Sequence, residues 1–296
     1  MPNIPITSIP SAQLLSGTTT RIPFTLVQFA SAFSPLSIGS MALWLDGLDP
    51  AGTGTYPSAG ATVSTWADKS TSAKNATAAG TPTYLSGGGI NFNGSSYFSN
   101  LSFAQNLSQR SIFIVMQETV HNAVFGVFPL IPTPSSGNDY NTTTGLTIET
   151  QNGLRFFGND GGYQSDIGNP TLLVKAIYND NMNVRAGSGY LNGTNATNVT
   201  ASYTAGTCSG YGIAARWLGS ISSAYSLNGK IYEIMYFNSP LGTTDRRNIE
   251  GYLAQKWGLT ASLPVGHPGK TQTFYSTTPL AGSLGGVTST IRFTNI

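Results

Sequence analysis

The sequence predicts an all-β fold, a sandwich or a barrel, built as one large domain or two small ones. Charged residues make up only 9% of the 296 residues, against about 25% in an ordinary soluble domain. Solvated helices usually carry many Glu and Lys residues, so this composition argues against a helical bundle or a coiled coil. The 35 glycines and 16 prolines are typical of many short strands joined by turns.

Short strands are expected over about 41–240. The first is Met41-Ala-Leu-Trp-Leu-Asp46. Ser111-Ile-Phe-Ile-Val-Met116 is a continuous apolar run, which is typical of a strand buried on both faces. Turn signals such as Asn93-Gly94 and Asn152-Gly153 separate the apolar runs. The other expected strands are 123–128, 145–149, 153–157, 171–178, 183–186, 189–192, 211–214 and 230–237.

One segment departs from the strand pattern. Between Thr244 and Trp257, apolar residues recur three and four positions apart, at 249, 252, 253 and 257. The segment begins with Thr and Asp and is followed by Gly258, and these are the usual start and stop signals of a helix. We therefore expect one helix at about 244–257, with its apolar face packed against the sandwich.

The first 40 residues form a segment of their own. Their prolines remove backbone donors and fix φ, so regular helix is not expected, yet the segment is too apolar for a solvated linker. An extended apolar arm needs a surface to lie on, either on its own domain or on another molecule. The expected division is an arm at 1–40, a core domain at 41–268 and a polar tail at 269–296. The arm residues expected to make assembly contacts are Ile4, Ile6, Ile9, Phe24, Phe29 and Phe33.

Several protein classes are excluded by charge and composition. The net charge is only +2 and no basic stripe is visible, so nucleic-acid binding is not expected. No apolar run is long enough for a membrane span, and the N-terminus lacks the pattern of a signal peptide. The single cysteine, Cys208, excludes an internal disulfide and is expected to be a small buried side chain. His121 and His267 have no second ligand nearby in sequence, so a histidine metal site is not expected.

Short motifs along the chain occur in an order that resembles a known family. Over about 42–268 the chain resembles the laminin-G-like, or concanavalin-A-like lectin/glucanase, family, and the resemblance implies a jelly-roll β-sandwich. The variant with Trp-x-Asp-x-Ser early and Ile-Glu-Gly-Tyr-Leu-Ala late is similar to structural proteins of large double-stranded DNA viruses and phages, and to some bacterial surface proteins. The motifs are Leu43-Trp-Leu-Asp46, Val63-Ser-Thr-Trp-Ala-Asp-Lys-Ser70, Ile90-Asn-Phe-Asn-Gly-Ser95, Tyr190-Leu-Asn-Gly193, Leu227-Asn-Gly-Lys-Ile-Tyr-Glu-Ile-Met-Tyr-Phe237 and Ile249-Glu-Gly-Tyr-Leu-Ala-Gln-Lys-Trp-Gly-Leu259, then Leu263-Pro264 and His267-Pro268.

The resemblance implies a virion structural protein without enzymatic activity, a minor capsid or shell component made in the host cytoplasm. Its partners would be other capsid or shell proteins in a large assembly, and a surface poor in charge fits one covered by partners. The alternative is a lectin-like attachment module that binds glycans. A glycoside hydrolase is a remote third alternative. No catalytic residue is expected, because the Glu residues are isolated and the Glu-x-Asp-x-x-Glu strand of related glucanases has no match.

Glycan-binding candidates follow from the lectin-like alternative. They are Trp217, Tyr163, Asp160 and Tyr203. Trp217 is the tryptophan whose sequence context most favours exposure, whereas Trp44, Trp66 and Trp257 are expected to pack in the core. Asp160 and Tyr163 are expected to lie in a loop that also contains Asp166.

No cofactor is expected unless calcium binds. Asp46, Asp49 and Asp68 are the candidate Ca²⁺ ligands, because carboxylates at a strand end can gather around that ion with backbone oxygens. The opposing interpretation is that Asp68 and Ser70 cap a turn while Asp46 and Asp49 are solvated. The segment 179–183 lacks the Gly and the terminal Glu of an EF-hand and is expected to be a hairpin turn.

Overall fold

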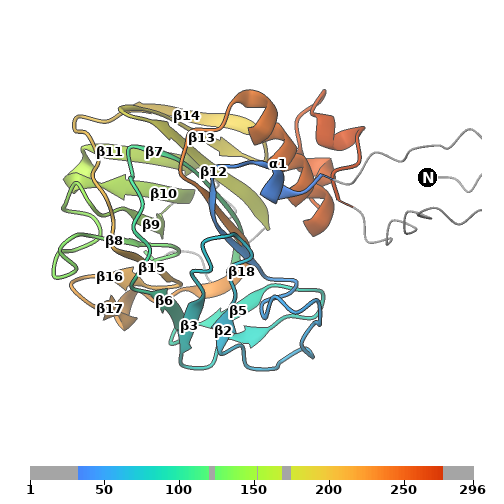
Figure 1. Ribbon diagram of the computed structural model, residues 1–296, viewed down its shortest axis with the longest axis horizontal. Coiled ribbons are helices and arrows are strands. Elements are labelled where there is room, and N and C mark those ends of the chain that lie inside the picture. Colours follow the sequence, from blue (N-terminus) through green and yellow to red (C-terminus); the bar gives the residue numbers. More distant parts are fainter. Residues whose placement is uncertain (1–32, 120–123, 152, 169–174, 276–296) are drawn as a thin grey trace, which may run out of the picture. The chain divides into compact units, whose positions relative to one another are not determined.

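The computed structural model describes residues 33–119, 124–151, 153–168 and 175–275 (Figure 1). Its largest element is an eight-stranded antiparallel sheet with the order β14-β13-β12-β7-β18-β5-β4, in which β1 also pairs with β18. The strands of this sheet are β1 (Met41–Asp46), β4 (Thr83–Tyr84), β5 (Ile90–Asn93), β7 (Gln109–Glu118), β12 (Ala176–Asn183), β13 (Ala186–Leu191), β14 (Thr194–Thr200) and β18 (Asn228–Phe237).

Three smaller antiparallel sheets complete the sandwich. The five-stranded sheet has the order β2-β3-β6-β15-β8, the three-stranded sheet is β11-β10-β9, and β16 pairs with β17. One hydrophobic core joins inward-facing side chains of the large sheet to those of the five- and three-stranded sheets. The strands are β2 (Thr65–Trp66), β3 (Ala76–Ala79), β6 (Tyr97–Asn100), β8 (Leu130–Ile131), β9 (Thr147–Thr150), β10 (Gly153–Gly158), β11 (Tyr163–Gly168), β15 (Gly210–Ile213), β16 (Arg216–Trp217) and β17 (Ile221–Ser222).

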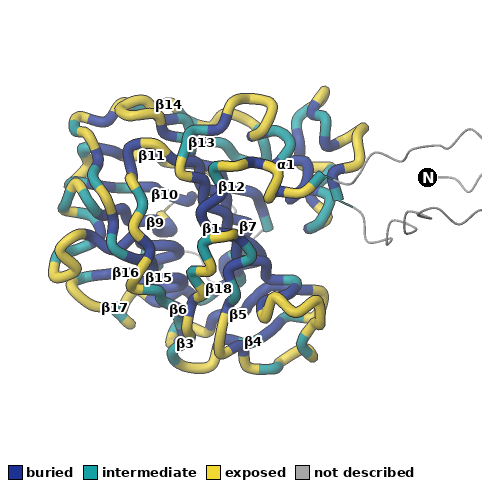
Figure 2. The backbone as a smooth tube through the Cα atoms, in the orientation of Figure 1, coloured by how far each residue is buried: buried dark blue, intermediate teal, exposed yellow. Residues whose placement is uncertain are grey.

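Strand β7 is buried on both faces, as its continuous apolar run predicts (Figure 2). Ile112, Ile114 and Met116 face the core between the sheets. Phe113 and Val115 point the other way, into a second core beneath the helix α1 (Thr243–Trp257). Successive side chains of a strand alternate between its two faces, so a strand covered on both sides has no polar side to show in its sequence. The prediction of an all-β sandwich is confirmed, and α1 is the one α-helix within the part of the chain that the structure describes.

Helix α1 begins one residue before its expected start and ends at the expected residue. Gly258 follows with φ 72°, a left-handed conformation in which its N–H caps the carbonyl of Ala254. Ile249, Leu253 and Trp257 pack into the second core. The short 3-10 helices are η1 (Pro35–Ser37), η2 (Asn159–Gly161), η3 (Ser223–Tyr225), η4 (Thr260–Ser262) and η5 (Pro268–Lys270). Within the described ranges, no helix has the length and apolar character that crossing a bilayer requires.

The packed region extends beyond the expected limits of 41 and 268. The ring of Phe33 meets Tyr252 edge-on at 6.4 Å and Phe274 at 5.8 Å between ring centres. The side-chain oxygen of Gln255 accepts the backbone N–H of Phe274 at 2.7 Å. Phe33, expected in an assembly arm, therefore packs on its own helix. The other five arm residues, Ile4, Ile6, Ile9, Phe24 and Phe29, lie outside the described residues, as do His121 and 276–296.

Two segments expected to be loops are strands. The segment 179–183, expected as a hairpin turn, lies inside β12, where Asp180 is fully buried against Arg110 at 2.8 Å. The segment around Asp166, expected as loop, is β11. Both are rich in polar residues, which weakens the strand signal in sequence. Their tertiary partners supply what the sequence does not show: an opposite charge for Asp180 and a backbone ladder with β10 for Asp166.

A charged aromatic pocket on the three-stranded sheet

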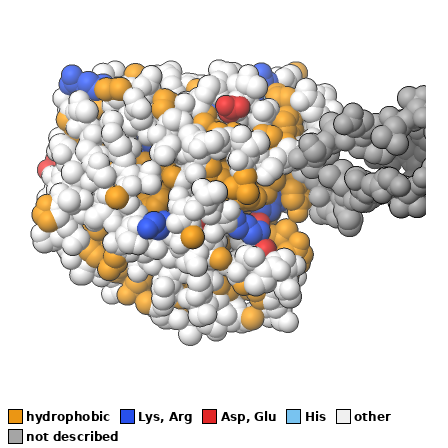
Figure 3. Space-filling model, viewed as in Figure 1, with side chains coloured by type: hydrophobic (Ala, Val, Ile, Leu, Met, Phe, Trp, Pro, Cys, Tyr) orange, Lys and Arg blue, Asp and Glu red, His pale blue; other side chains and the backbone are white. Residues whose placement is uncertain are grey.

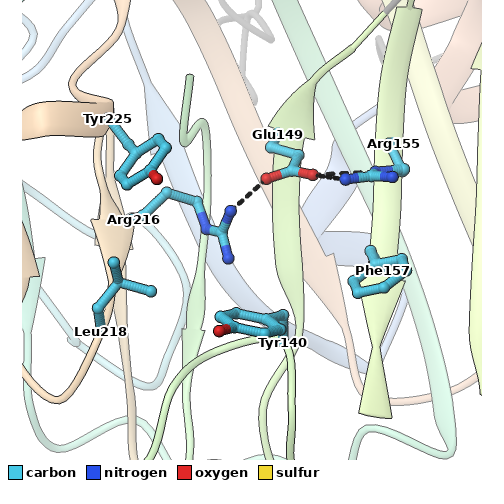
Figure 4. Close-up of a pocket in the computed structure, with 7 residues that line it drawn as sticks. All are labelled: Tyr140, Glu149, Arg155, Phe157, Arg216, Leu218 and Tyr225. Atoms are coloured by element: carbon cyan, nitrogen blue, oxygen red, sulfur yellow. Dashed lines mark hydrogen bonds and ion pairs between the residues drawn. The ribbon is translucent and has the colours of Figure 1, made fainter. Parts of the chain in front are cut away.

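A pocket of about 260 Å³ lies over the outer face of β9 and β10 (Figure 4). Ile148 and Phe156 point into the core, so the alternation of the strands turns Glu149, Arg155 and Phe157 outward. Residues from outside the three-stranded sheet close the remaining sides. The lining residues are Tyr140, Glu149, Arg155, Phe157, Arg216, Leu218 and Tyr225.

Two arginines and two carboxylates form a continuous ion-pair network in the pocket. Arg216 donates to Glu149 Oε2 at 2.5 Å and makes a forked contact with Asp139, at 2.7 Å from Nη2 and 3.0 Å from Nε. The Nε of Arg155 donates to Glu149 Oε1 at 2.9 Å, and its Nη2 contacts the same oxygen. Burial alone would lower the pKa of Arg216, but Asp139 and Glu149 outweigh it and raise that pKa above its ordinary value.

Aromatic rings flank both guanidinium groups. The guanidinium carbon of Arg216 lies 5.2 Å from the ring centre of Tyr140 and 5.6 Å from that of Tyr225, and Figure 4 shows the two rings on opposite sides of it. The guanidinium carbon of Arg155 lies 4.6 Å from the ring centre of Phe157. Such cation–π contacts fix the planar groups in orientation. Rings and guanidinium planes are therefore held in place before any ligand arrives.

The backbone around Arg216 is shaped by close approaches. Gly126 bridges to Glu149 of β9 and lies so near the chain before Arg216 that a Cβ there would sit 2.1 Å from the carbonyl oxygen of Ala215. Only glycine fits such an approach. Ala214 adopts φ 65°, a left-handed conformation that costs a non-glycine residue free energy. Backbone strain of this kind is tolerated where the surrounding structure holds it in place.

None of the four residues predicted to bind glycans lines this pocket. Trp217, the tryptophan whose sequence context most favours exposure, is only 7% exposed, and its indole N–H donates to the carbonyl of Ser135 at 2.7 Å. Tyr163 is 1% exposed and donates to Asp180, so its ring has no face for a ligand. Tyr203 is partly buried against the core. Asp160 is exposed, and its N–H donates to the carbonyl of Tyr140 at 2.8 Å.

Two of the three acidic residues proposed for calcium, Asp46 and Asp49, belong to a second ion network, beneath α1. Lys69 contacts Asp46 at 2.8 Å and Asp49 at 3.0 Å, so an ammonium group already bridges these two carboxylates. Lys256 contacts Asp46 at 2.7 Å and Glu233 at 2.9 Å. Asp46 and Asp49 are each 5% exposed, so the interpretation that they are solvated is wrong. Burial and Asp46 raise the pKa of Glu233, although Lys256 opposes them.

Asp68 caps a turn, as one of the two interpretations predicts. It accepts the backbone N–H groups of Trp44, Ser70 and Lys74 at 2.8–2.9 Å, together with the hydroxyl of Ser70. Backbone donors thus occupy the carboxylate that a Ca²⁺ site would need. Among the described residues, no group of three or more His, Cys, Asp or Glu side chains is placed to hold a metal ion. A calcium site at these aspartates stays a prediction without a matching donor set.

The remaining titratable candidates are structural. His267 is 1% exposed, accepts the N–H of Gly269 through Nδ1 and lies 3.0 Å from a carboxylate oxygen of Glu250. Cys208 is buried, as predicted, and burial raises the pKa of its thiol to about 12. Trp44, Trp66 and Trp257 are all buried, which confirms their assignment to the core.

Sequence reasoning missed the pocket residues, although part of the signal was present. The expected strands 145–149 and 153–157 flank the turn signal Asn152-Gly153. A hairpin centred there places Glu149 opposite Arg155, and the observed register does so. Arg216, Tyr140 and Tyr225 come from separate segments that no local pattern joins to this hairpin.

The comparisons with known proteins bear on the fold. No family model and no curated protein matches the sequence. A mutant of Trypanosoma rangeli sialidase displaying trans-sialidase activity is similar in structure, with 15% identity and a TM-score of 0.51 over 76% of this chain and 36% of that one. The chain therefore spans about a third of the length of that sialidase.

Two further structures are similar at lower scores. One is domain 4 of an extracellular arabinanase from Geobacillus stearothermophilus in complex with arabinotriose, at 13% identity, TM-score 0.47, over 64% of this chain and 97% of that one. The other is the botulinum neurotoxin serotype D/C binding domain, at 13% identity, TM-score 0.49, over 73% and 52%. None of these proteins supports the expected role in a virion shell. The chain is a β-sandwich, and its architecture is consistent with the concanavalin-A-like fold.

Proposed function

We propose that the chain is a carbohydrate-binding module whose site is the pocket on the outer face of the three-stranded sheet. The observation that carries the proposal is the buried Glu149 carboxylate, held between two guanidinium groups that are themselves stacked on aromatic rings. The proposal keeps the lectin-like alternative of the sequence and moves its site from Trp217 to the neighbouring Arg216.

The chemistry of sugars matches these groups. A sugar ring presents an apolar C–H face, which packs on an aromatic ring, and hydroxyls around its edge, which pair with planar polar side chains. Tyr225 is 37% exposed and the Arg155 side chain is 20% exposed, so a ligand can reach both kinds of group. Pockets for drug-sized ligands usually measure about 300–1,000 Å³. This one is smaller, which suits a single sugar residue.

The contacts of the two buried carboxylates favour binding without hydrolysis. Cleavage of a glycosidic bond needs one carboxyl group to donate a proton and a second to act as base or nucleophile. Here Glu149 accepts from Arg155 and Arg216, and Asp139 accepts from Arg216 through both oxygens. Both carboxylates are thus engaged by guanidinium groups and buried, so neither is free to serve as the acid, the base or the nucleophile of a cleavage reaction.

The test is a binding screen followed by titration of variants. The purified protein is applied to a glycan array with calcium and, separately, with a chelator, and the best ligand is titrated by calorimetry. Tyr140→Ala and Tyr225→Ala are each expected to weaken binding by about tenfold, which corresponds to about 1.4 kcal/mol. Tyr56→Ala is the control, because Tyr56 is 58% exposed and lies outside the pocket lining.

Two results would contradict the proposal. An array that stays blank under both conditions would remove carbohydrate as the ligand class. Binding that survives both pocket substitutions but is lost in the Tyr56 variant would place the site elsewhere on the molecule.

A further inference from the structure

We infer that the site takes an uncharged glycan and discriminates against acidic sugars. The inference rests on the proposed function and concerns the charge of the ligand. An arginine-lined pocket would ordinarily attract carboxylate, sulfate or phosphate groups. The ion pairs and the rim of this pocket reverse that expectation.

The positive charge of the pocket is already neutralised from below. Arg216 directs three of its donor contacts to Asp139 and one to Glu149. Arg155 directs two to Glu149. The side chains of Asp139 and Glu149 are 0% and 1% exposed, so they cannot turn outward to be solvated if their partners leave. A ligand anion that took over either arginine would leave a buried carboxylate unpaired, which costs several kcal/mol.

Around the two lining arginines, the rim of the pocket carries negative charge. Asp166 on β11 lies directly opposite Arg155 on β10, and neighbouring residues of an antiparallel pair are about 5 Å apart. Asp166 is exposed and accepts from Gln164 at 2.6 Å. Asp160 is exposed next to the backbone of Tyr140.

The charges at the site therefore sum to less than zero. Two guanidinium groups face three carboxylates, those of Asp139, Glu149 and Asp166. An acidic sugar would meet this net negative charge, whereas the hydroxyls of a neutral sugar can hydrogen-bond to the accessible Arg155 and Asp166 without breaking an ion pair. Discrimination comes from the repelling carboxylates as well as from the rings that attract the sugar.

The experiment compares matched ligands. Neutral oligosaccharides ending in galactose, glucose, mannose, arabinose or xylose are titrated beside the same glycans carrying a sialic acid, a uronic acid or a sulfate. The neutral member of a pair is expected to bind at least about tenfold more tightly. Raising NaCl from about 0.1 M to about 1 M shortens the screening length from about 10 Å to about 3 Å and is expected to leave neutral binding within about twofold.

Asp166→Asn tests the source of the discrimination. The substitution removes an exposed rim charge whose described side-chain partner is the amide of Gln164, so the fold is expected to persist. The preference for the neutral glycan is expected to narrow by about two- to threefold, in the range of a partly screened charge pair. Asp245→Asn makes the same change of charge at the exposed start of α1 and is expected to leave the preference unchanged.

The outcomes separate the inference from the function on which it rests. Tighter binding of the acidic glycans, weakened by salt and lost in Tyr140→Ala, would overturn the inference and leave the carbohydrate site standing. Equal binding of both members of each pair would also overturn it. If neither set binds, the proposed function and the inference fall together.

Discussion

Replacing Lys256 by methionine should lower the free energy of unfolding, because the Lys256 ammonium links α1 to two carboxylates of the large sheet. The register of β1 and β18 places Asp46 directly opposite Glu233, and like charges in that arrangement repel. The Lys256 ammonium lies between them, 2.7 Å from Asp46 and 2.9 Å from Glu233. Its side chain is 1% exposed and that of Glu233 is 0% exposed, so water cannot replace the lost charge.

The magnitude follows from what each carboxylate keeps. Glu233 retains the indole N–H groups of Trp44 and Trp257, at 2.7 and 2.6 Å, but no cation. Asp46 retains Lys69. Removing one partner of a buried ion pair usually costs about 3–5 kcal/mol. Because one of the two carboxylates stays paired, we expect a loss near the lower end, about 3 kcal/mol. In a domain of this size that lowers Tm by about 6–12 °C.

The assay is urea unfolding followed by circular dichroism, with Lys270→Met as the matched control. Lys270 is exposed and its ammonium lies 3.4 Å from one carbonyl, so its replacement should change the free energy of unfolding by less than about 0.5 kcal/mol. The double variant with Glu233→Gln should lose at least about 1 kcal/mol less than the two single losses added together. A Lys256 loss below about 1 kcal/mol, or strict additivity, would refute the reasoning.

Three further predictions concern pH, thiol chemistry and the pocket. Burial alone would raise the pKa of Asp46, but the ammonium groups of Lys256 and Lys69 outweigh burial and lower that pKa from its ordinary value of 3.8. The contribution of Asp46 to stability is therefore present above pH 3.8 and is lost as the pH falls through the pKa of Asp46 in the folded protein. Asp46→Asn should flatten the acid-unfolding curve below pH 3.8. Because burial raises the pKa of Cys208 to about 12, an aromatic disulfide reagent at neutral pH should label it only after urea unfolding, and labelling of the native protein would contradict its burial. Arg216→Lys cannot make the forked contact with Asp139, so it should cost about 2 kcal/mol in stability and most of the glycan binding; wild-type binding would remove Arg216 from the site.

The strand and helix pattern was readable from sequence wherever one element carried its own signal. The apolar run of β7 and the three-and-four spacing of α1 each predicted burial that the cores confirm. Strand β11 and the polar half of β12 were not predicted as strands, because their burial depends on partners that lie far away in the chain, such as Arg110 for Asp180. A short polar segment has no intrinsic strand signal until its neighbours are known.

The motifs that carry the family resemblance turn out to build the structure rather than the site. Leu43-Trp-Leu-Asp46 supplies an indole and a carboxylate, the segment of β18 supplies Glu233, and the helix motif supplies Lys256 and Trp257. These residues meet in one buried network that fixes α1 on the sheet. The pocket is built from residues outside the motifs, which is why sequence reasoning pointed to Trp217 and Asp160 nearby but not to Arg216 and Glu149.

The most direct test of the carbohydrate site is a crystal structure of the protein with the neutral oligosaccharide that binds most tightly on the array. A sugar ring is predicted to lie against Tyr140, Tyr225 or Phe157, with hydroxyls hydrogen-bonded to the partly exposed Arg155. The crystals should keep the Arg216–Asp139 and Arg216–Glu149 contacts intact. A sugar bound on another face of the sandwich, with the pocket unchanged, would contradict the account.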